Sequence, residues 1–318
     1  MNILRLLSLL PSLTVLAHNH PPTTTTGTIL TTDNIHLNYT QSGPLHGRNI
    51  VFIPGWRQTA SEWQKQATYF SQSGFRVTTY DMRGHGDSDK PSFGYRLSRF
   101  AADLNDLLDQ LKLTDVAIVG HSMGCSVAWA WWDQYNLVTK PKPGKHGHGN
   151  SPRRVVSSLM LVDQPAVMVR NPAWSDEYAA RVGAIFEPQG IYDMANDIGA
   201  QLPSMLRGMF TTEVTEEEYQ WVLAQNLKMS DENGAALLID HGLADWRDVL
   251  PRIDVPTLVI AGDVSVFPVE GVRWVAEQIP GAEEYTFGQE ERGSHFMFWE
   301  NPERFNEVVK DFLTRGSV

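Results

Sequence analysis

Short apolar runs alternate with amphipathic helical patterns along most of the chain. A run such as Asn49–Ile53 is too short for an ordinary helix and is ended by Pro54-Gly55. Segments such as Tyr95–Leu111 carry apolar residues at helical spacing. Strands alternating with helices form a mostly parallel, doubly wound sheet of the α/β class. About eight strands are expected: a pair over Thr28–Gln41, then Asn49–Ile53, Phe75–Tyr80, Val116–Val119, Val155–Val162, Thr257–Ala261 and Ala282–Phe287.

The composition excludes several classes of protein. Hydrophobic residues make up 42% of the 318 residues and charged residues 20%, which supplies a core and excludes general disorder. The net charge of −11 argues against nucleic acid or an anionic membrane as a partner. Cys125 is the single cysteine, so the chain can form no internal disulfide or cysteine-based zinc site, and we expect a small buried hydrophobe there.

The N-terminus predicts a secretory signal peptide over residues 1–17. Arg5 precedes a largely apolar stretch, Leu6–Leu16, which is too short to span a membrane comfortably. We therefore expect a secreted protein without an integral membrane segment in its mature form; the alternative is a cytoplasmic protein with a disordered leader. The sequon at Asn38 falls in an expected strand, so its glycosylation stays open.

Two segments interrupt the alternation. Thr139–Arg154 is rich in Lys, Gly, His and Pro and is expected to be a surface insertion, where His146 and His148 are too few to predict a metal site. Residues 166–248 contain helical patterns and no strand, and they separate the core segments 27–165 and 249–318. An apolar helical insertion between two strands predicts a lid over the sheet edge and a mostly apolar substrate of modest size. The lid residues expected to contact substrate are Met168, Trp174, Met205 and Met209.

The segment Gly120-His121-Ser122-Met123-Gly124 follows an apolar strand and opens a helix. Glycines allow the tight turn that lifts a serine hydroxyl above the sheet. The N-terminus of the following helix favours developing negative charge. The pattern predicts Ser122 as a nucleophile; a structural turn serine is the alternative.

A serine nucleophile needs a base and an acid, which follow it along the chain in the order acid, then histidine. His295, just after the last expected strand, is the predicted base. A carboxylate is usual in the loop after Thr257–Ala261, but the expected position holds Ser265, and Asp263 comes close to the strand end. Asp163, at the end of the neighbouring strand, is therefore the predicted acid and Asp263 the alternative.

Acyl transfer also needs donors for an oxyanion, and the backbone N–H groups of Met123 and Trp56 are the predicted pair. The Trp56 indole should also line the pocket. The other histidines near these motifs are not expected to be the base. His121 points along the turn, and His85 lies in a Gly-rich loop where a structural role is expected. His241 is expected to be a surface or core residue of the lid. No metal and no organic cofactor are expected.

From Asn49 to the C-terminal helix the chain resembles the α/β-hydrolase-fold superfamily. The matching motifs are Pro54-Gly55, Asp81–Gly86, the turn at Ser122, the strand Pro256–Ile260 and Gly293–Phe296. With its predicted acid after the sixth strand, the chain resembles the branch that includes lactone hydrolases and cofactor-free dioxygenases. The dioxygenases carry a histidine directly after the serine, where this chain has Met123, which weakens that resemblance. Epoxide hydrolases and haloalkane dehalogenases of this fold use an aspartate nucleophile, and Ser122 argues against both.

Three functions remain at this point. The first is a serine hydrolase of apolar carboxylic esters or lactones that acts through an acyl-enzyme. The second is a cofactor-free oxidoreductase, either a perhydrolase or haloperoxidase working through a peracid, or a dioxygenase. The third is a non-catalytic ligand-binding relative. Serine-dependent ester turnover, peroxide-dependent halogenation and oxygen consumption distinguish them.

Overall fold

The computed structural model describes residues 24–139 and 155–315. The predicted signal peptide and the histidines at 146 and 148 lie outside these ranges. Within them, no helix has the length and apolar character needed to cross a membrane. The same residues bring together no group of three His, Cys, Asp or Glu side chains suited to a metal ion.

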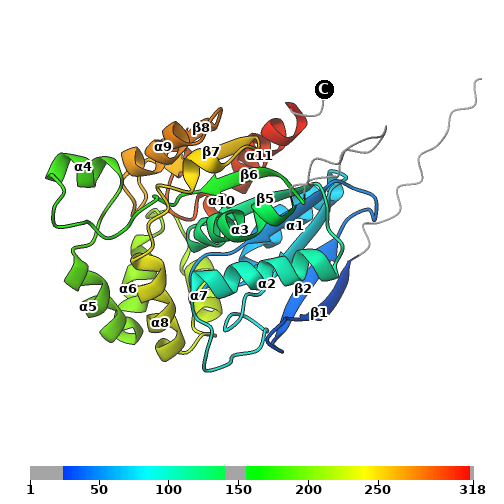
Figure 1. The fold of residues 1–318 in the computed structure, drawn as a ribbon, viewed down its shortest axis with the longest axis horizontal. Helices are drawn as coiled ribbons and strands as arrows, with labels where there is room; N and C mark the ends of the chain where they lie inside the picture. The colour runs from blue at the N-terminus through cyan, green and yellow to red at the C-terminus, as the bar shows by residue number, and fades with distance from the viewer. Residues whose placement is uncertain (1–23, 140–154, 316–318) are drawn as a thin grey trace, which may run out of the picture.

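The molecule is built on one open sheet of eight strands in the order β1-β2-β4-β3-β5-β6-β7-β8 (Figure 1). All neighbours from β4 to β8 in this order are parallel, and only the pairs β1–β2 and β2–β4 are antiparallel. The predicted α/β class and strand number are confirmed. The strands are β1 Thr25–Leu30, β2 His36–Ser42, β3 Asn49–Ile53, β4 Arg76–Tyr80, β5 Val116–His121, β6 Val156–Val162, β7 Thr257–Gly262 and β8 Glu283–Phe287.

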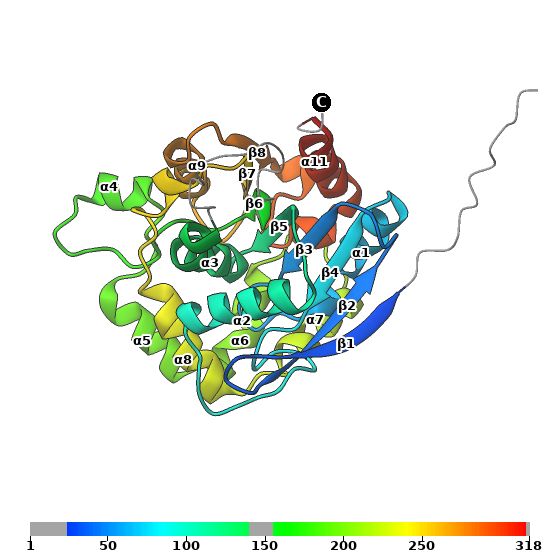
Figure 2. The same cartoon turned by 45° about the vertical axis from the view of Figure 1, so that its right-hand side comes forward.

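The central strands are buried on both faces, because successive side chains point to opposite sides and helices cover both sides. In β3, Val51 and Ile53 join one hydrophobic cluster, while Ile50 and Phe52 join a second. The first cluster packs under α2 (Leu97–Gln110), α3 (Met123–Thr139) and α9 (Val269–Gln278). The second packs under α1 (Gln64–Gln72), α10 (Met297–Glu300) and α11 (Pro302–Arg315). Figures 1 and 2 show these helices on the two sides of the strands.

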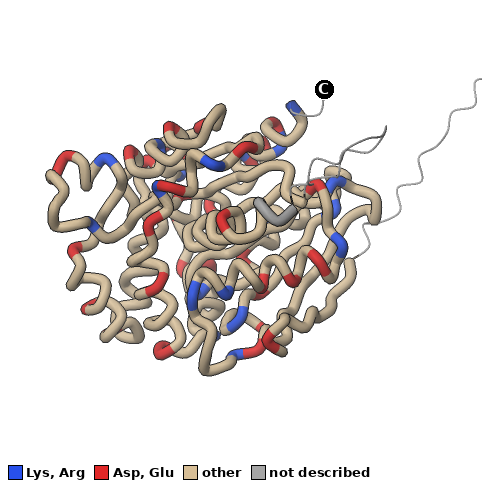
Figure 3. Tube along the Cα trace, in the orientation of Figure 1, with Lys and Arg blue, Asp and Glu red and all other residues tan. Residues whose placement is uncertain are grey.

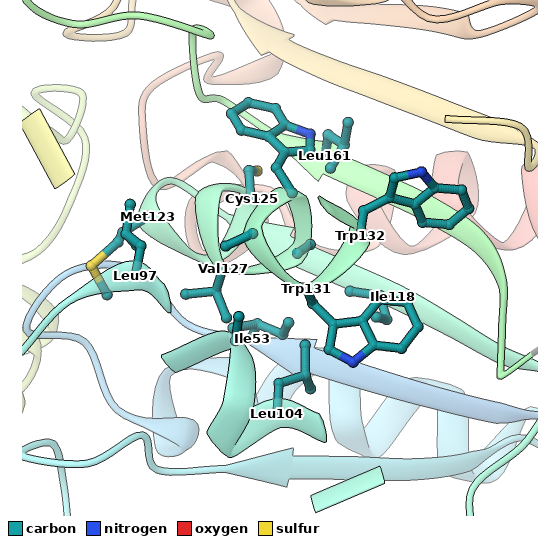
Figure 4. Packing of buried hydrophobic residues seen from close by; sticks show 14 of the residues in the cluster. Ile53, Leu97, Leu104, Ile118, Met123, Cys125, Val127, Trp131, Trp132 and Leu161 are labelled. Atoms are coloured by element: carbon teal, nitrogen blue, oxygen red, sulfur yellow. The ribbon is translucent and has the colours of Figure 1, made fainter. Parts of the chain in front are cut away.

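Helix α3 follows Ser122, and its residues 123–132 are all buried. The side chain of Trp131 in α3 packs in one hydrophobic cluster with Leu104 of α2 and Ile118 of β5 (Figure 4). These side chains are at most 1% exposed, and burying each of them stabilises the fold by about 2 kcal/mol. The position of Ser122 is therefore set by a rigid strand and a rigid helix.

Five helices lie between β6 and β7, and we call them the cap helices. Helices α5, α6 and α8 pack against one another beside the sheet (Figures 1 and 2). Two isolated β-bridges, Val167–Asp245 and Val169–Phe186, also occur in this part of the chain, where only helices were expected. The cap helices are α4 Asp176–Arg181, α5 Pro188–Asn196, α6 Ile198–Gly208, α7 Glu216–Asn226 and α8 Asp231–Gly242; short 3₁₀ turns occur at Ala60–Trp63, Leu250–Arg252 and Gln289–Glu291.

Acidic and basic residues are interspersed along the described chain in Figure 3. Most ion pairs are at the surface, where each contributes little to stability. An exception is Arg83, which is fully buried and bonds to Asp103 on α2 at 2.6 Å and to Asp33 at 2.8 Å. This pairing attaches the loop after β4 to α2 and to the β1–β2 turn.

Candidate active site

Ser122 lies at the junction of β5 and α3. Its backbone has φ of +52°, a conformation that costs energy for a residue with a side chain and is held here by the strand and the helix. A Cβ at Gly120 would lie 2.7 Å from the carbonyl carbon of Gly124, and one at Gly124 would overlap the carbonyl oxygen of Ile53. Only glycine fits at these two positions, which explains the spacing of the motif.

His295 and Asp163 form a buried pair beside this turn. The Nδ1 atom of His295 lies 2.5 Å from Oδ2 of Asp163, and the two side chains are 2% and 0% exposed. Asp163 follows the end of β6 with φ of +53°, so the residues after two neighbouring strands both have left-handed backbone. Asp263 follows β7, is exposed and has its backbone N–H bonded to Phe287. The carboxylate that contacts His295 is therefore that of Asp163.

Ser122 and His295 line one small cavity of about 30 Å³. Because Asp163 occupies Nδ1 of His295, Nε2 is the ring nitrogen left for a group in the cavity. A larger surface hollow of about 670 Å³ lies between the first two strands and α1, but it contains none of the residues predicted for the site. The smaller cavity is lined by Trp56, Gln58, Ser122, Leu202, Met205, Leu206, Met209, Asn226, His295 and Phe296.

The loop after β3 lies directly against Ser122. Strands β3 and β5 are neighbours, and a Cβ at Gly55 would lie 3.1 Å from Cβ of Ser122. Trp56 follows and lines the cavity, and its indole N–H donates to the carbonyl of Gly234 on α8 at 2.9 Å. The side chain of Met123 is fully buried in the core (Figure 4), so only its backbone is available at the turn. The oxyanion role of Trp56 and Met123 remains a prediction.

Two of the four lid residues predicted to contact substrate do not line this cavity. Met168 is 4% exposed and belongs to the main hydrophobic cluster. Trp174 packs against Tyr178 with ring centroids 5.3 Å apart and against the guanidinium of Arg247. Both precede α4, which packs on α9. Met205 and Met209, in and directly after α6, do line the cavity.

Sequence analysis missed Gln58, which connects three parts of the site. Its Oε1 accepts the N–H of Gly55 at 2.5 Å and lies 2.9 Å from Nδ1 of His121. The other ring nitrogen of His121 lies 2.8 Å from the carbonyl oxygen of His295. Both ring nitrogens of His121 thus face protein oxygens, and His121 is not among the residues that line the cavity with Ser122. The sequence shows that a polar residue stands four positions after Pro54. It does not show which groups that residue contacts.

Besides His295, three histidines of the described chain are buried, and their pKa values are lowered. Burial lowers the pKa of His85 to about 4 and that of His241 to about 3. Burial, together with the nearby His295, lowers the pKa of His121 well below its usual value. His85 accepts the backbone N–H of Arg57 at 3.1 Å, which agrees with the structural role predicted for it. His241 is buried in the last turn of α8, so its side chain belongs to the core.

This burial predicts a loss of stability in mild acid. Unfolded histidine takes up a proton near pH 6.5, whereas His241 in the folded protein does so only near pH 3. Its contribution is therefore complete above about pH 6.5 and is lost as the pH falls toward 3. Urea unfolding of the His241→Gln variant should show a drop in unfolding free energy between about pH 7.5 and about pH 5 that is smaller by about 2 kcal/mol than in the wild type. His36→Gln, at an exposed position, is the control, and equal pH dependence of the two variants would contradict this account.

The fold and this site define an α/β-hydrolase: a doubly covered parallel sheet, a serine at a strand-to-helix turn, and a buried Asp–His pair beside it. The model of the alpha/beta hydrolase family matches residues 50–308, and the chain belongs to that family.

Named relatives of the chain include several activities. It is 32% identical over 297 residues to the non-heme chloroperoxidase CPO-A1 of Kitasatospora aureofaciens, a match that covers 90% of this chain and 98% of the relative. It is 27% identical over 290 residues to 3-oxoadipate enol-lactonase 2 of Acinetobacter baylyi, with 90% and 96% covered. Among solved structures, an esterase from Exiguobacterium antarcticum matches with a TM-score of 0.76 and 27% identity, covering 90% of this chain and 98% of the esterase.

Proposed function

We propose that this protein is a serine hydrolase that cleaves a carboxylic ester or lactone of a mostly apolar small molecule. The observation that supports the proposal most strongly is the sharing of one cavity by Ser122 and by His295, whose other ring nitrogen bonds to the buried Asp163. An esterase and an enol-lactonase among the similar proteins support the same reaction class.

In the proposed mechanism, the hydroxyl of Ser122 attacks the carbonyl carbon of the ester. His295 accepts the serine proton at Nε2 and then donates it to the leaving alcohol. Asp163 keeps the proton on Nδ1 and stabilises the imidazolium that forms. A water molecule, deprotonated by His295, then hydrolyses the acyl-enzyme. These steps use protein groups and water, with no metal or organic cofactor.

The developing negative charge on the carbonyl oxygen would be stabilised by the backbone N–H groups of Trp56 and Met123. Support for this assignment comes from the close approach of Gly55 to Ser122 and from the position of Met123 at the start of α3. Donors held rigidly by a loop and a helix N-terminus need no rearrangement in the transition state.

The cap helices, within residues 166–248, would act as the lid of the site. Their apolar side chains Leu202, Met205 and Met209 line the cavity together with Trp56 and Phe296. The cavity is small, at about 30 Å³, so we propose a preference for short acyl groups.

A series of p-nitrophenyl esters tests this preference. We expect kcat/KM to be highest for the acetyl ester and to fall as the acyl chain lengthens. Met209→Ala should raise the hexanoate-to-acetate ratio of kcat/KM by about tenfold or more, because each methylene accommodated changes binding by about 1 kcal/mol. Trp174→Ala, which changes a cap residue outside the cavity, should leave the ratio as in the wild type. An unchanged ratio in the Met209 variant would contradict the proposed acyl site.

A cofactor-free perhydrolase or haloperoxidase is the second candidate, because a relative with 32% identity is named a non-heme chloroperoxidase. The same acyl-enzyme attacked by hydrogen peroxide instead of water would release a peracid, which oxidises halide. Halogenation that requires peroxide, a carboxylic acid and Ser122 would favour this activity. Oxygen consumption without added cofactor would favour a dioxygenase, and binding without Ser122-dependent turnover would favour a non-catalytic relative.

Secretion is a separate proposal that rests on residues 1–17 alone. Expression of the full chain in a secreting host, followed by N-terminal mass determination of the protein in the medium, tests it. Cleavage after residue 17 would support a signal peptide, and retention of the intact N-terminus inside the cell would contradict it.

A further inference from the structure

We propose that Ser265 is a positioning residue for the base His295 and that it acts through Asp163. The inference rests on the proposed function, since it assigns a role in the same reaction. Ser265 follows β7, lies outside the cavity that contains Ser122, and is half-buried. Its hydroxyl donates a hydrogen bond to Oδ2 of Asp163, the same oxygen that contacts Nδ1 of His295.

The direction of this hydrogen bond follows from its surroundings. The backbone N–H of Phe267 points at Oγ of Ser265 from 3.4 Å, so the serine oxygen is the acceptor in that contact. The serine proton is then free to bond to the carboxylate of Asp163. The other oxygen of that carboxylate, Oδ1, accepts the N–H of Gly262 at 3.2 Å. Both oxygens of Asp163 are therefore held by donors from β7 and the loop that follows it.

The hydroxyl of Ser265 has no evident substitute. Asp163 is completely buried, so bulk water has no access to a carboxylate oxygen that loses a donor. A lost hydrogen bond to a buried charged group is among the costly single changes in a protein. Without this donor, Gly262 and His295 would still contact the carboxylate, but its orientation toward Nδ1 would be less restrained.

The loop that carries Ser265 also contacts His295 and the residues before it. The N–H of Val264 donates to the carbonyl of Gly293 at 3.0 Å, and the ring of Phe267 packs edge-on against His295 at 5.3 Å. The loop thus touches both members of the Asp–His pair. The effect of Ser265 on the rate should appear when His295 becomes an imidazolium. This happens in the transition state and not in the complex with bound substrate.

Steady-state kinetics with p-nitrophenyl acetate provides the first test. Ser265→Ala should lower kcat by about tenfold to a hundredfold and leave KM within about twofold, because Ser265 does not line the cavity. Ser265→Thr keeps the hydroxyl and should retain kcat within about threefold. Val266→Ala alters an exposed neighbour in the same loop and serves as the control. A wild-type kcat in Ser265→Ala, or an equal loss in the Thr and Ala variants, would overturn the proposal.

A double variant tests whether Ser265 acts through Asp163. In an Asp163→Asn background, Ser265→Ala should change kcat by less than about twofold, because the carboxylate that it orients is already gone. A further loss as large as that seen in the wild-type background would show that Ser265 acts by another route and would overturn the proposal.

Proton NMR separates this inference from the proposed function, since it needs no substrate. The Nδ1 proton of His295 should give a downfield resonance that is lost in Asp163→Asn, shifted in Ser265→Ala and unchanged in Val266→Ala. If no ester is hydrolysed and the resonance still shifts in Ser265→Ala, the proposed function fails while the positioning role stands. If Ser122-dependent hydrolysis occurs and Ser265→Ala changes neither kcat nor the resonance, the positioning role alone is wrong.

Discussion

Replacing Ser122 with alanine is expected to lower kcat for p-nitrophenyl acetate by at least about 10⁴-fold while the protein stays folded. In the proposed mechanism, this hydroxyl forms the acyl-enzyme. The nearby thiol of Cys125 is not an equivalent nucleophile, because it is fully buried and burial raises its pKa well above the usual value. The stability should change little, because alanine accepts the left-handed backbone of this turn about as well as serine does.

The control for this experiment is Ser126→Ala, which removes a buried serine hydroxyl one turn further along α3. Its turnover should equal that of the wild type. Both variants are measured with the same ester, and their folding is compared by circular dichroism and thermal unfolding. Ester hydrolysis that persists in a folded Ser122→Ala protein would show that the nucleophile has been assigned wrongly.

Asp163→Asn is expected to lower kcat by about 10⁴-fold, whereas Asp263→Asn should change it by less than about threefold. An asparagine at 163 can present its amide N–H to the ring, which favours the wrong tautomer of His295 and cannot stabilise an imidazolium. Asp263 is exposed at the end of the adjacent strand and is not the carboxylate that contacts the ring. The two substitutions remove the same charge, so a general effect of net charge would act equally on both.

The two aspartate variants are compared by kcat and KM at one pH, with thermal unfolding to check that each is folded. The opposite ranking, with Asp263→Asn the slower enzyme, would overturn the assignment of the acid and would imply that the loop after β7 rearranges when substrate binds. Asp163→Asn should also lower the free energy of unfolding, because the carboxylate that it removes is completely buried. The kinetic comparison is therefore made only on protein that unfolds cooperatively.

Much of the fold could be predicted because its signals are local. A fully buried strand such as β3 must be apolar on both faces, and the residues that end it, Pro54-Gly55, are visible in the sequence. The predicted strand bounds differ from the observed ones by only a few residues. Helix α9 was not predicted, since its ten residues follow a loop with no distinctive start signal.

The residues predicted for the site also carried signals in the sequence. The glycines around Ser122 are required by the backbone of the turn, and the order of Ser122, Asp163 and His295 along the chain follows from the order of the strands. By contrast, the sequence could not separate the apolar cap residues that line the cavity from those that pack in the core. Met168 and Met209 are equivalent in chemistry, yet one lies in the core and the other lines the cavity.

For the partners of Ser122, the sequence supplied only a prediction, His295 and Asp163. The sequence by itself determined the α/β class and the position of the turn that carries Ser122. Each of these depends on periodicity or on a backbone requirement within a few residues. Only the tertiary structure decided which cap side chains face Ser122, and which polar groups of the β3 and β7 loops, Gln58 and Ser265, bond to the site. Those contacts join residues more than sixty positions apart, and their geometry depends on how whole elements pack, which no local pattern encodes.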